Sequence, residues 1–247
     1  MSKTYETGHA KNVANFETLV TILNGFGAAY NPSNANLQLG SLGQKAADAR
    51  LATEQVNQLL AANNSAIAVR EQAFEPLSKL STRIFNAVKA SGVPDVVVEQ
   101  VTTHHRKLQG RRASAKLSEA EKQALAAKGT PANQVSASQL SFDSRLDTFD
   151  KLIKLLGTIP QYTPNEVELQ LASLTTLYQD LLQQNREVIS KNTDLSIARI
   201  NRNTVCYDEE TGMIALALNA KNYAKSVFGT TTPQYKQIAG ITFRYIP

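Results

Sequence analysis

The sequence contains a thirteen-residue segment twice, and this repeat constrains the fold more than any other feature. Residues 30–42 read YNPSNANLQLGSL and residues 162–174 read YTPNEVELQLASL, so that seven of the thirteen positions are identical. Average residue frequencies would give about one identity. The similarity continues upstream with the offset changed by one residue, where Phe16 corresponds to Phe149 and Leu23 to Leu156. An internal duplication predicts two similar halves that bury their apolar surfaces together.

Each copy leads into a long stretch with helical periodicity. Proline is absent between Asn34 and Phe74, and residues at alternating spacings of four and three are mostly apolar, which is the seam of a heptad repeat. The second long helix is predicted from Pro164 to about Cys206. Helices of about 40 residues are roughly 60 Å long. The two seams are Leu42, Ala46, Ala49, Thr53, Val56, Leu60, Asn63, Ile67, Arg70 and Phe74, and Leu174, Tyr178, Leu181, Asn185, Val188, Asn192, Leu195, Arg199, Arg202 and Cys206.

The polar residues in these seams have two interpretations. A polar side chain at a seam position fixes the register and the number of partner helices, at some cost in stability. Alternatively, the seam is shifted by one residue and these side chains face water. The sequence leaves both interpretations open.

Shorter helices are predicted on either side of the long ones. Residues 1 to about 11 are expected to form a loose tail, and residues after 240 an extended tail that docks on the helices. Proline and glycine residues limit the helices between these tails. The predicted ranges are 12–29, 77–90, 94–108, 141–156, 213–228 and 233–238.

The predicted fold is therefore all-α. It is an elongated helical bundle made of two tandem long-helix hairpins related by pseudo-two-fold symmetry. The expected domains are a first repeat at residues 1–109, a basic linker rich in Ala and Ser at 110–138, and a second repeat with the C-terminal tail at 139–247. A composition with 6% aromatic residues and no Trp favours helices over a sheet sandwich.

The positive charge of the chain is concentrated in one segment. Residues 104–128 carry seven Lys and Arg against two Glu, which equals the net charge of +5 for the whole chain. Arg106, Lys107, Arg111 and Arg112 are therefore the candidate partner contacts. Such a segment could bind nucleic acid independently of its sequence, although it lacks the interleaved aromatic residues that stack on bases.

No catalytic, cofactor-binding or metal-binding residues are predicted. Cys206 is the single thiol, and of the three histidines His9 lies in the predicted tail. The adjacent His104 and His105 diverge by about 100° on a helix and do not easily face one ion. We therefore expect a protein that is not an enzyme and needs no cofactor.

Composition also bears on the compartment. The polar N-terminus lacks the apolar segment of a secretory signal, and the purest apolar run, residues 214–218, is too short to cross a membrane. A cytoplasmic protein is expected. A helical pore-forming toxin is a further alternative, although such toxins usually carry a long apolar hairpin and none is visible.

Several segments resemble a family of uncharacterised bacterial helical proteins with an internal duplication. The similarity lies in QYTPNE at residues 161–166, RINRNTV at 199–205, KSVFG at 225–229 and PQYKQI at 233–238, together with the YNP segment and KLQGRR at 107–112. No activity is attached to that family, so the resemblance transfers no functional residue. The function expected from the sequence is a structural or protein-interaction scaffold that assembles with itself.

Overall fold

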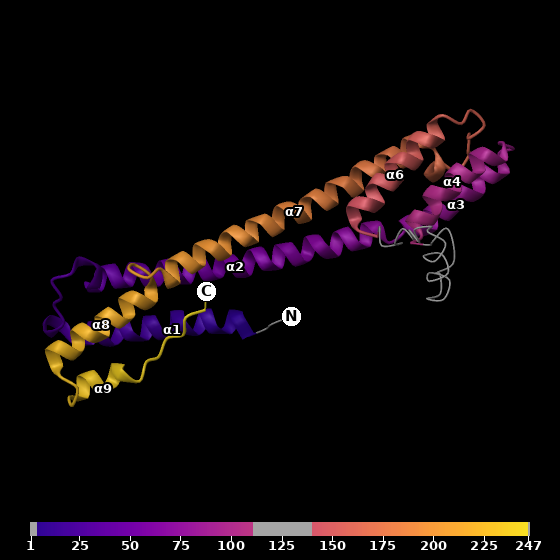
Figure 1. Ribbon diagram of the computed structural model, residues 1–247. Coiled ribbons are helices and arrows are strands. Elements are labelled where there is room, and N and C mark those ends of the chain that lie inside the picture. The colour runs from indigo at the N-terminus through magenta and orange to yellow at the C-terminus, as the bar shows by residue number, and fades with distance from the viewer. Residues whose placement is uncertain (1–3, 111–139, 247) are drawn as a thin grey trace, which may run out of the picture. The chain divides into compact units, whose positions relative to one another are not determined.

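The computed structural model of the 247-residue chain describes residues 4–110 and 140–246. Every regular element in these two ranges is a helix, which confirms the all-α prediction for this part of the chain (Figure 1). The α-helices are α1 (Thr4–Gly25), α2 (Leu39–Phe74), α3 (Leu77–Ala90), α4 (Asp95–Leu108), α6 (Phe142–Gly157), α7 (Leu171–Tyr207), α8 (Met213–Phe228) and α9 (Pro233–Ala239). Short 3-10 helices lie at η1 (Gly27–Ala29), η2 (Ala35–Leu37) and η3 (Val167–Leu169).

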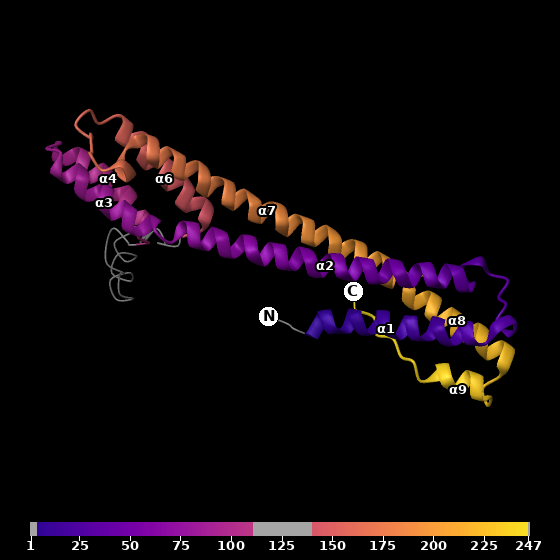
Figure 2. The same cartoon turned by 180° about the vertical axis from the view of Figure 1, so that it is seen from behind.

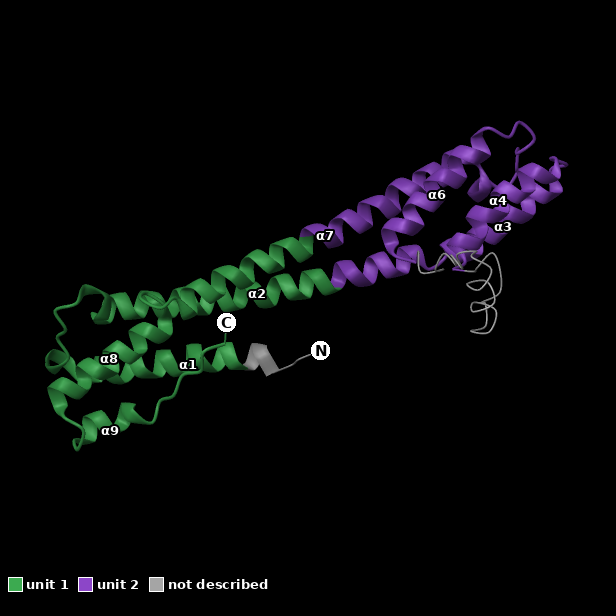
Figure 3. Cartoon of the chain, viewed as in Figure 1, with its two compact units in different colours: residues 1–64, 191–247 green, residues 65–190 purple. Residues whose placement is uncertain are grey.

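Two compact units divide the chain, and each takes helices from both halves of the sequence (Figure 3). Unit 1 comprises residues 1–64 and 191–247, and unit 2 comprises residues 65–190. The long helices α2 and α7 therefore each contribute one end to unit 1 and the other end to unit 2. The domain division predicted above follows the sequence copies instead, and its linker lies almost wholly outside the described residues.

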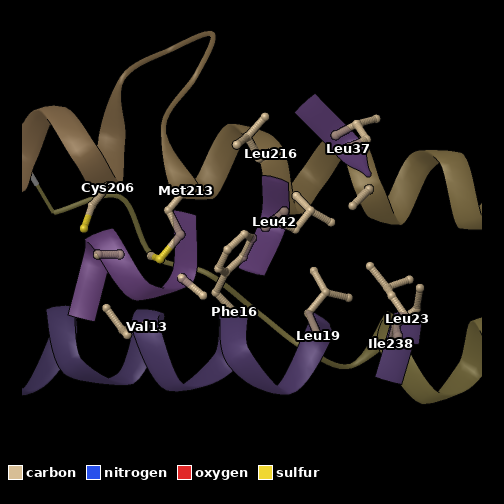
Figure 4. Packing of buried hydrophobic residues seen from close by; sticks show 14 of the residues in the cluster. Val13, Phe16, Leu19, Leu23, Leu37, Leu42, Cys206, Met213, Leu216 and Ile238 are labelled. Carbon is tan, nitrogen blue, oxygen red and sulfur yellow. The ribbon is translucent and has the colours of Figure 1, made fainter. Parts of the chain in front are cut away.

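Unit 1 is built around α1, which lies along α8 (Figures 1 and 2). The apolar face of α1 carries Phe16 and Leu19, both fully buried, and these side chains point toward Leu42 of α2 and Met213 of α8 (Figure 4). Burying a side chain of this size stabilises the fold by about 1.5–3 kcal/mol. The core of unit 1 thus joins the first and last thirds of the chain.

The C-terminal tail docks on α1 through side-chain amides. Asn12 donates to the carbonyl of Arg244 at 2.6 Å and accepts from the Arg244 amide at 3.0 Å. Asn15 donates to the carbonyl of Thr242 at 2.8 Å. A Cβ atom on Gly8 would lie 2.3 Å from the Ile246 side chain, so glycine allows this close approach. The extended tail agrees with the sequence expectation.

The start of the chain differs from that expectation. Residues 1–11 were expected to form a loose tail, but α1 begins at Thr4 and the His9 side chain is buried. The partner of His9 is Tyr207, which is 198 residues away in the sequence. Local periodicity carries no information about so distant a contact. The helix start predicted from the sequence was therefore too late.

Unit 2 packs α3, α4 and α6 around the ends of the two long helices. Its core contains Phe74 from α2, Ile84 from α3, Phe149 from α6 and Leu174 from α7, all of them fully buried. The guanidinium of Arg145 donates to the carbonyl of Phe74 at 2.6 Å. This bond satisfies a carbonyl at the end of α2, where the helix has no further turn to supply a donor.

The repeated segments adopt the same conformation. Residues before η2 and η3 have similar backbone angles, with φ −74° and ψ 117° at Asn34 and φ −68° and ψ 115° at Glu166. The Tyr30 hydroxyl donates to the Leu37 carbonyl at 2.9 Å, and the Tyr162 hydroxyl donates to the Leu169 carbonyl at 2.8 Å. Burial raises the pKa of both tyrosines to about 12. The identical residues thus encode the same turn twice, each time anchored by a buried tyrosine and a buried leucine.

The predicted seams are correct for most of their length. In unit 2 the Arg70 guanidinium lies 3.9 Å from the centre of the Phe142 ring and donates to Asn185, which donates in turn to Asp143. Asn192 and Arg199, however, are exposed, while Ala198 is buried. The next seam positions, Arg202 and Cys206, are buried again, so the departure is local to this stretch of α7.

Candidate functional site

The basic candidates predicted from the sequence are only partly placed. Arg106 and Lys107 lie in the last turn of α4 with exposed side chains. Arg111 and Arg112 lie outside the described residues. Two exposed cations at a helix C-terminus are favourably placed with respect to the helix dipole. The role of these four residues as partner contacts stays a prediction.

The neighbouring histidines face the interior of unit 2 instead. The His105 ring stacks on Phe85 at 5.0 Å between centroids, and its Nδ1 lies 3.2 Å from the Ser81 hydroxyl. Burial, followed by the charges of Lys107 and Lys151, lowers the pKa of His104. Both rings therefore serve packing in unit 2, and they do not extend the exposed basic surface of Arg106 and Lys107.

The thiol of Cys206 is buried in the core of unit 1. Burial raises its pKa to about 11, which keeps it protonated at neutral pH. Because the thiolate is the reactive form, this environment gives no activated nucleophile. Within residues 4–110 and 140–246, no three or more His, Cys, Asp or Glu side chains group as metal ligands would.

A buried polar cluster joins α1 to the end of α7 in unit 1. The Tyr207 hydroxyl lies 2.5 Å from Nδ1 of His9 and 3.3 Å from the amide nitrogen of Asn12. Burial, followed by the charge of Arg202, lowers the pKa of His9 to about 4, so the ring is neutral and can accept a hydrogen bond from the Tyr207 hydroxyl. Tyr245 packs edge-on against Tyr207. The cluster thus connects both ends of the chain to α7.

Unit 2 contains an open cleft between α3 and the repeated turn, which we call the α3 groove. Its volume is about 650 Å³, within the range of ligand pockets. Arg83, Ala87 and Ser91 line it from α3, and Tyr162 and Pro164 line it from the turn. At the edge, Arg83 forms an exposed ion pair with Glu168 at 2.7 Å.

In unit 1 the equivalent position is filled by Tyr223 of α8. The succession of buried, half-buried and exposed positions is identical over residues 81–90 of α3 and 217–226 of α8. That register places Ala87 in the position of Tyr223. The Tyr223 ring packs edge-on against Tyr30, with centroids 5.2 Å apart. Pro32 is buried in unit 1, whereas its counterpart Pro164 is only half-buried in the groove.

A second surface feature is an apolar face on α7, which we call the isoleucine face. It consists of Ile197 and Ile200, which are 60% and 65% exposed. At about 100° per residue, the two positions lie about 60° apart around the helix. Exposed apolar residues gathered on one helix face are typical of contact surfaces.

Sequence reasoning missed both the α3 groove and the isoleucine face. The spacing of Ile197 and Ile200, out of phase with the seam, was a signal that could have found the face. The groove depends on the register of α3 against α8, which only the burial pattern reveals. Little in the residues 81–90 and 217–226 themselves indicates this register, because few identities connect them.

Comparisons with known protein families, with curated proteins and with solved structures found no match to this chain. Among the helices of the described ranges, none combines the length and the apolar character that crossing a membrane requires.

Proposed function

We propose that this protein is a non-enzymatic interaction scaffold that assembles with itself through the isoleucine face of α7. The observation that carries the proposal is the exposure of Ile197 and Ile200, at 60% and 65%, on one side of a helix of 37 residues. On its other side the same stretch buries Leu195 and Ala198 against Val56 of α2. A helix with apolar residues on two sides is typical of one that has partners on both.

A second copy of the chain is the partner we propose for this face. Most soluble homo-oligomers are closed and symmetric, and in a two-fold dimer the same patch of each subunit meets its own copy. The isoleucine face suits such pairing because it is apolar and self-complementary.

The proposal includes the tandem architecture expected from the sequence. Two copies of one long-helix hairpin module, related by pseudo-two-fold symmetry in an elongated bundle, would give the scaffold two similar surfaces. The matching hydrogen bonds of Tyr30 and Tyr162 support this interpretation. The matching burial of α3 and α8 supports it as well.

Sedimentation equilibrium over a range of concentrations tests the self-assembly directly. The wild-type chain is expected to associate, and Ile200→Glu is expected to raise the dissociation constant at least about tenfold. Burying an isoleucine is worth about 1.5–3 kcal/mol, and about 1.4 kcal/mol corresponds to tenfold. Leu51→Glu on α2 is the matched control, because Leu51 is 66% exposed. A wild-type chain that stays monomeric at every concentration contradicts the proposal.

Nucleic-acid binding is the second candidate, and the exposure of Arg106 and Lys107 favours it. Each phosphate that these cations neutralise releases counterions, so the affinity should fall steeply as salt is added. Fluorescence anisotropy with a mixed-sequence oligonucleotide measures this. Replacing both residues with Gln should reduce the slope of log affinity against log salt concentration by about two. An unchanged slope removes these residues from the interface.

A further inference from the structure

We propose that the α3 groove is a binding site for a tyrosine side chain carried by a peptide segment of a partner protein. The proposal rests on a difference between the Tyr30 turn of unit 1 and the Tyr162 turn of unit 2. In unit 1 the chain seats its own Tyr223 against the turn of Tyr30. In unit 2 the matching position is Ala87, and an open cleft of about 650 Å³ lies beside the turn of Tyr162.

The shape of the groove agrees with an aromatic occupant. The same turn, with the same hydrogen bond from tyrosine to a carbonyl seven residues on, forms one wall in both units. Since the wall is alike, it offers an entering ring the edge-to-face arrangement that Tyr223 adopts in unit 1. Such aromatic pairs are favourable beyond the area that they bury. Pro164, half-buried in the groove, adds apolar surface that its counterpart Pro32 has already buried.

Charge and size distinguish a peptide from a small phenol. Among the ionisable lining residues Arg83 and Glu166 carry opposite charges, and Arg83 is already paired with Glu168. The groove therefore favours a neutral ring over an anionic group. A cleft of this volume holds more than one ring. Asn86, Gln161 and Asn165 line the remainder and supply amide groups for the backbone of a bound segment.

This inference rests on the proposed function, because it gives the scaffold a specific site for a protein partner. It does not depend on self-assembly, however, since the groove lies on α3 and the isoleucine face on α7. Ile200→Glu should weaken self-association and leave the groove unchanged. Ala87→Tyr should block the groove and leave self-association unchanged. The two proposals therefore fail separately.

The test is a titration of the full chain with the probe acetyl-Gly-Tyr-Gly-amide. Binding is monitored by NMR of labelled tyrosine rings. We expect saturable shifts at Tyr162, with a dissociation constant on the order of 1 mM. The Ala-centred tripeptide is the control and should cause none. p-Cresol should bind at least about tenfold more weakly than the tyrosine tripeptide, because it lacks the backbone groups.

Two variants should have opposite effects, since one fills the groove and the other opens a second one. Ala87→Tyr fills the groove from within, so the tripeptide should lose at least about tenfold in affinity. Tyr223→Ala opens the matching place in unit 1, so a second set of shifts should appear at Tyr30. Absence of shifts at Tyr162 in the wild-type chain, or unchanged binding to the Ala87→Tyr variant, overturns the site. Equal affinity for p-cresol and the tripeptide overturns the peptide as its ligand.

Discussion

The two repeated turns differ less in their own structure than in what covers them. Tyr30 and Tyr162 are 4% and 5% exposed, and each donates its hydroxyl proton to a carbonyl seven residues later. Beside Tyr30 the chain places the ring of Tyr223, while beside Tyr162 it places the methyl group of Ala87. At this matched position the neighbouring helix therefore presents an aromatic ring in unit 1 and a methyl group in unit 2.

The turn and the helix that covers it differ in how well they tolerate substitution. Positions within the turn make buried hydrogen bonds, and leaving a buried polar group without a partner costs about 1–3 kcal/mol. On the covering helices, the matched residues Ala87 and Tyr223 are half-buried. Their substitution alters the surface without removing the support of the fold, so the covering helix is where two copies can acquire different contacts.

The largest expected effect comes from the core phenylalanines of α1 and α6. Phe16→Ala and Phe149→Ala should each lower the free energy of unfolding of their own unit by about 3–5 kcal/mol, because each side chain is fully buried. Hydrogen exchange measured separately on α1 and α6 provides the readout. The unit without the substitution serves as the control. If only one of the two variants loses stability, the two phenylalanines are not equivalent.

Acidification should destabilise unit 1 through His9. The pKa of His9 is lowered to about 4 from an ordinary value of 6.5, so the unfolded chain binds this proton more readily than the folded one. The stabilisation is therefore complete above pH 6.5 and is lost as pH falls toward 4. The loss is up to about 3 kcal/mol and should appear in the hydrogen exchange of α1, while the lowered pKa of His104 gives unit 2 a pH dependence of the same sign.

A variant with the residue of the other copy is the control for this pH dependence. At the offset that aligns Phe16 with Phe149, His9 corresponds to Phe142. His9→Phe should destabilise unit 1 at neutral pH, because Tyr207 loses its acceptor, but should flatten the dependence between pH 6.5 and 4. An equally steep dependence in the variant would assign the titration to another group.

A smaller and equal effect is expected from the two tyrosine hydroxyls. Tyr30→Phe and Tyr162→Phe each leave a carbonyl without its side-chain donor, at Leu37 and Leu169. We expect a loss of about 1–2 kcal/mol in each case, measured by urea denaturation. A difference of more than about 1 kcal/mol between the two would mean that the cover, and not the turn, determines the strength of this bond.

Much of the fold followed from local patterns in the sequence. Residues 77–90 and 213–228 were predicted as helices with the bounds that α3 and α8 have, because proline and glycine limit them on both sides. The buried seam of α2 followed from heptad spacing. The exposure of Asn192 and Arg199 did not, because it depends on which neighbours α7 meets at those positions.

The candidate sites were harder to predict, for a physical reason. The α3 groove exists because Ala87 is small at a position where Tyr223 is large, and the correspondence between them appears only when α3 and α8 are placed in equivalent surroundings. The contact of His9 with Tyr207 likewise joins the two ends of the chain. A basic segment, by contrast, is visible in the sequence, although charge alone does not specify its partner.

The most direct test is whether the ring contact between Tyr223 and Tyr30 in unit 1 can be reproduced in unit 2. Nuclear Overhauser contacts between tyrosine rings, measured in the Ala87→Tyr variant, provide this test. The account predicts a contact between the introduced ring and Tyr162, alongside the contact between Tyr223 and Tyr30 in the same spectrum. Observation of the second contact without the first would contradict it.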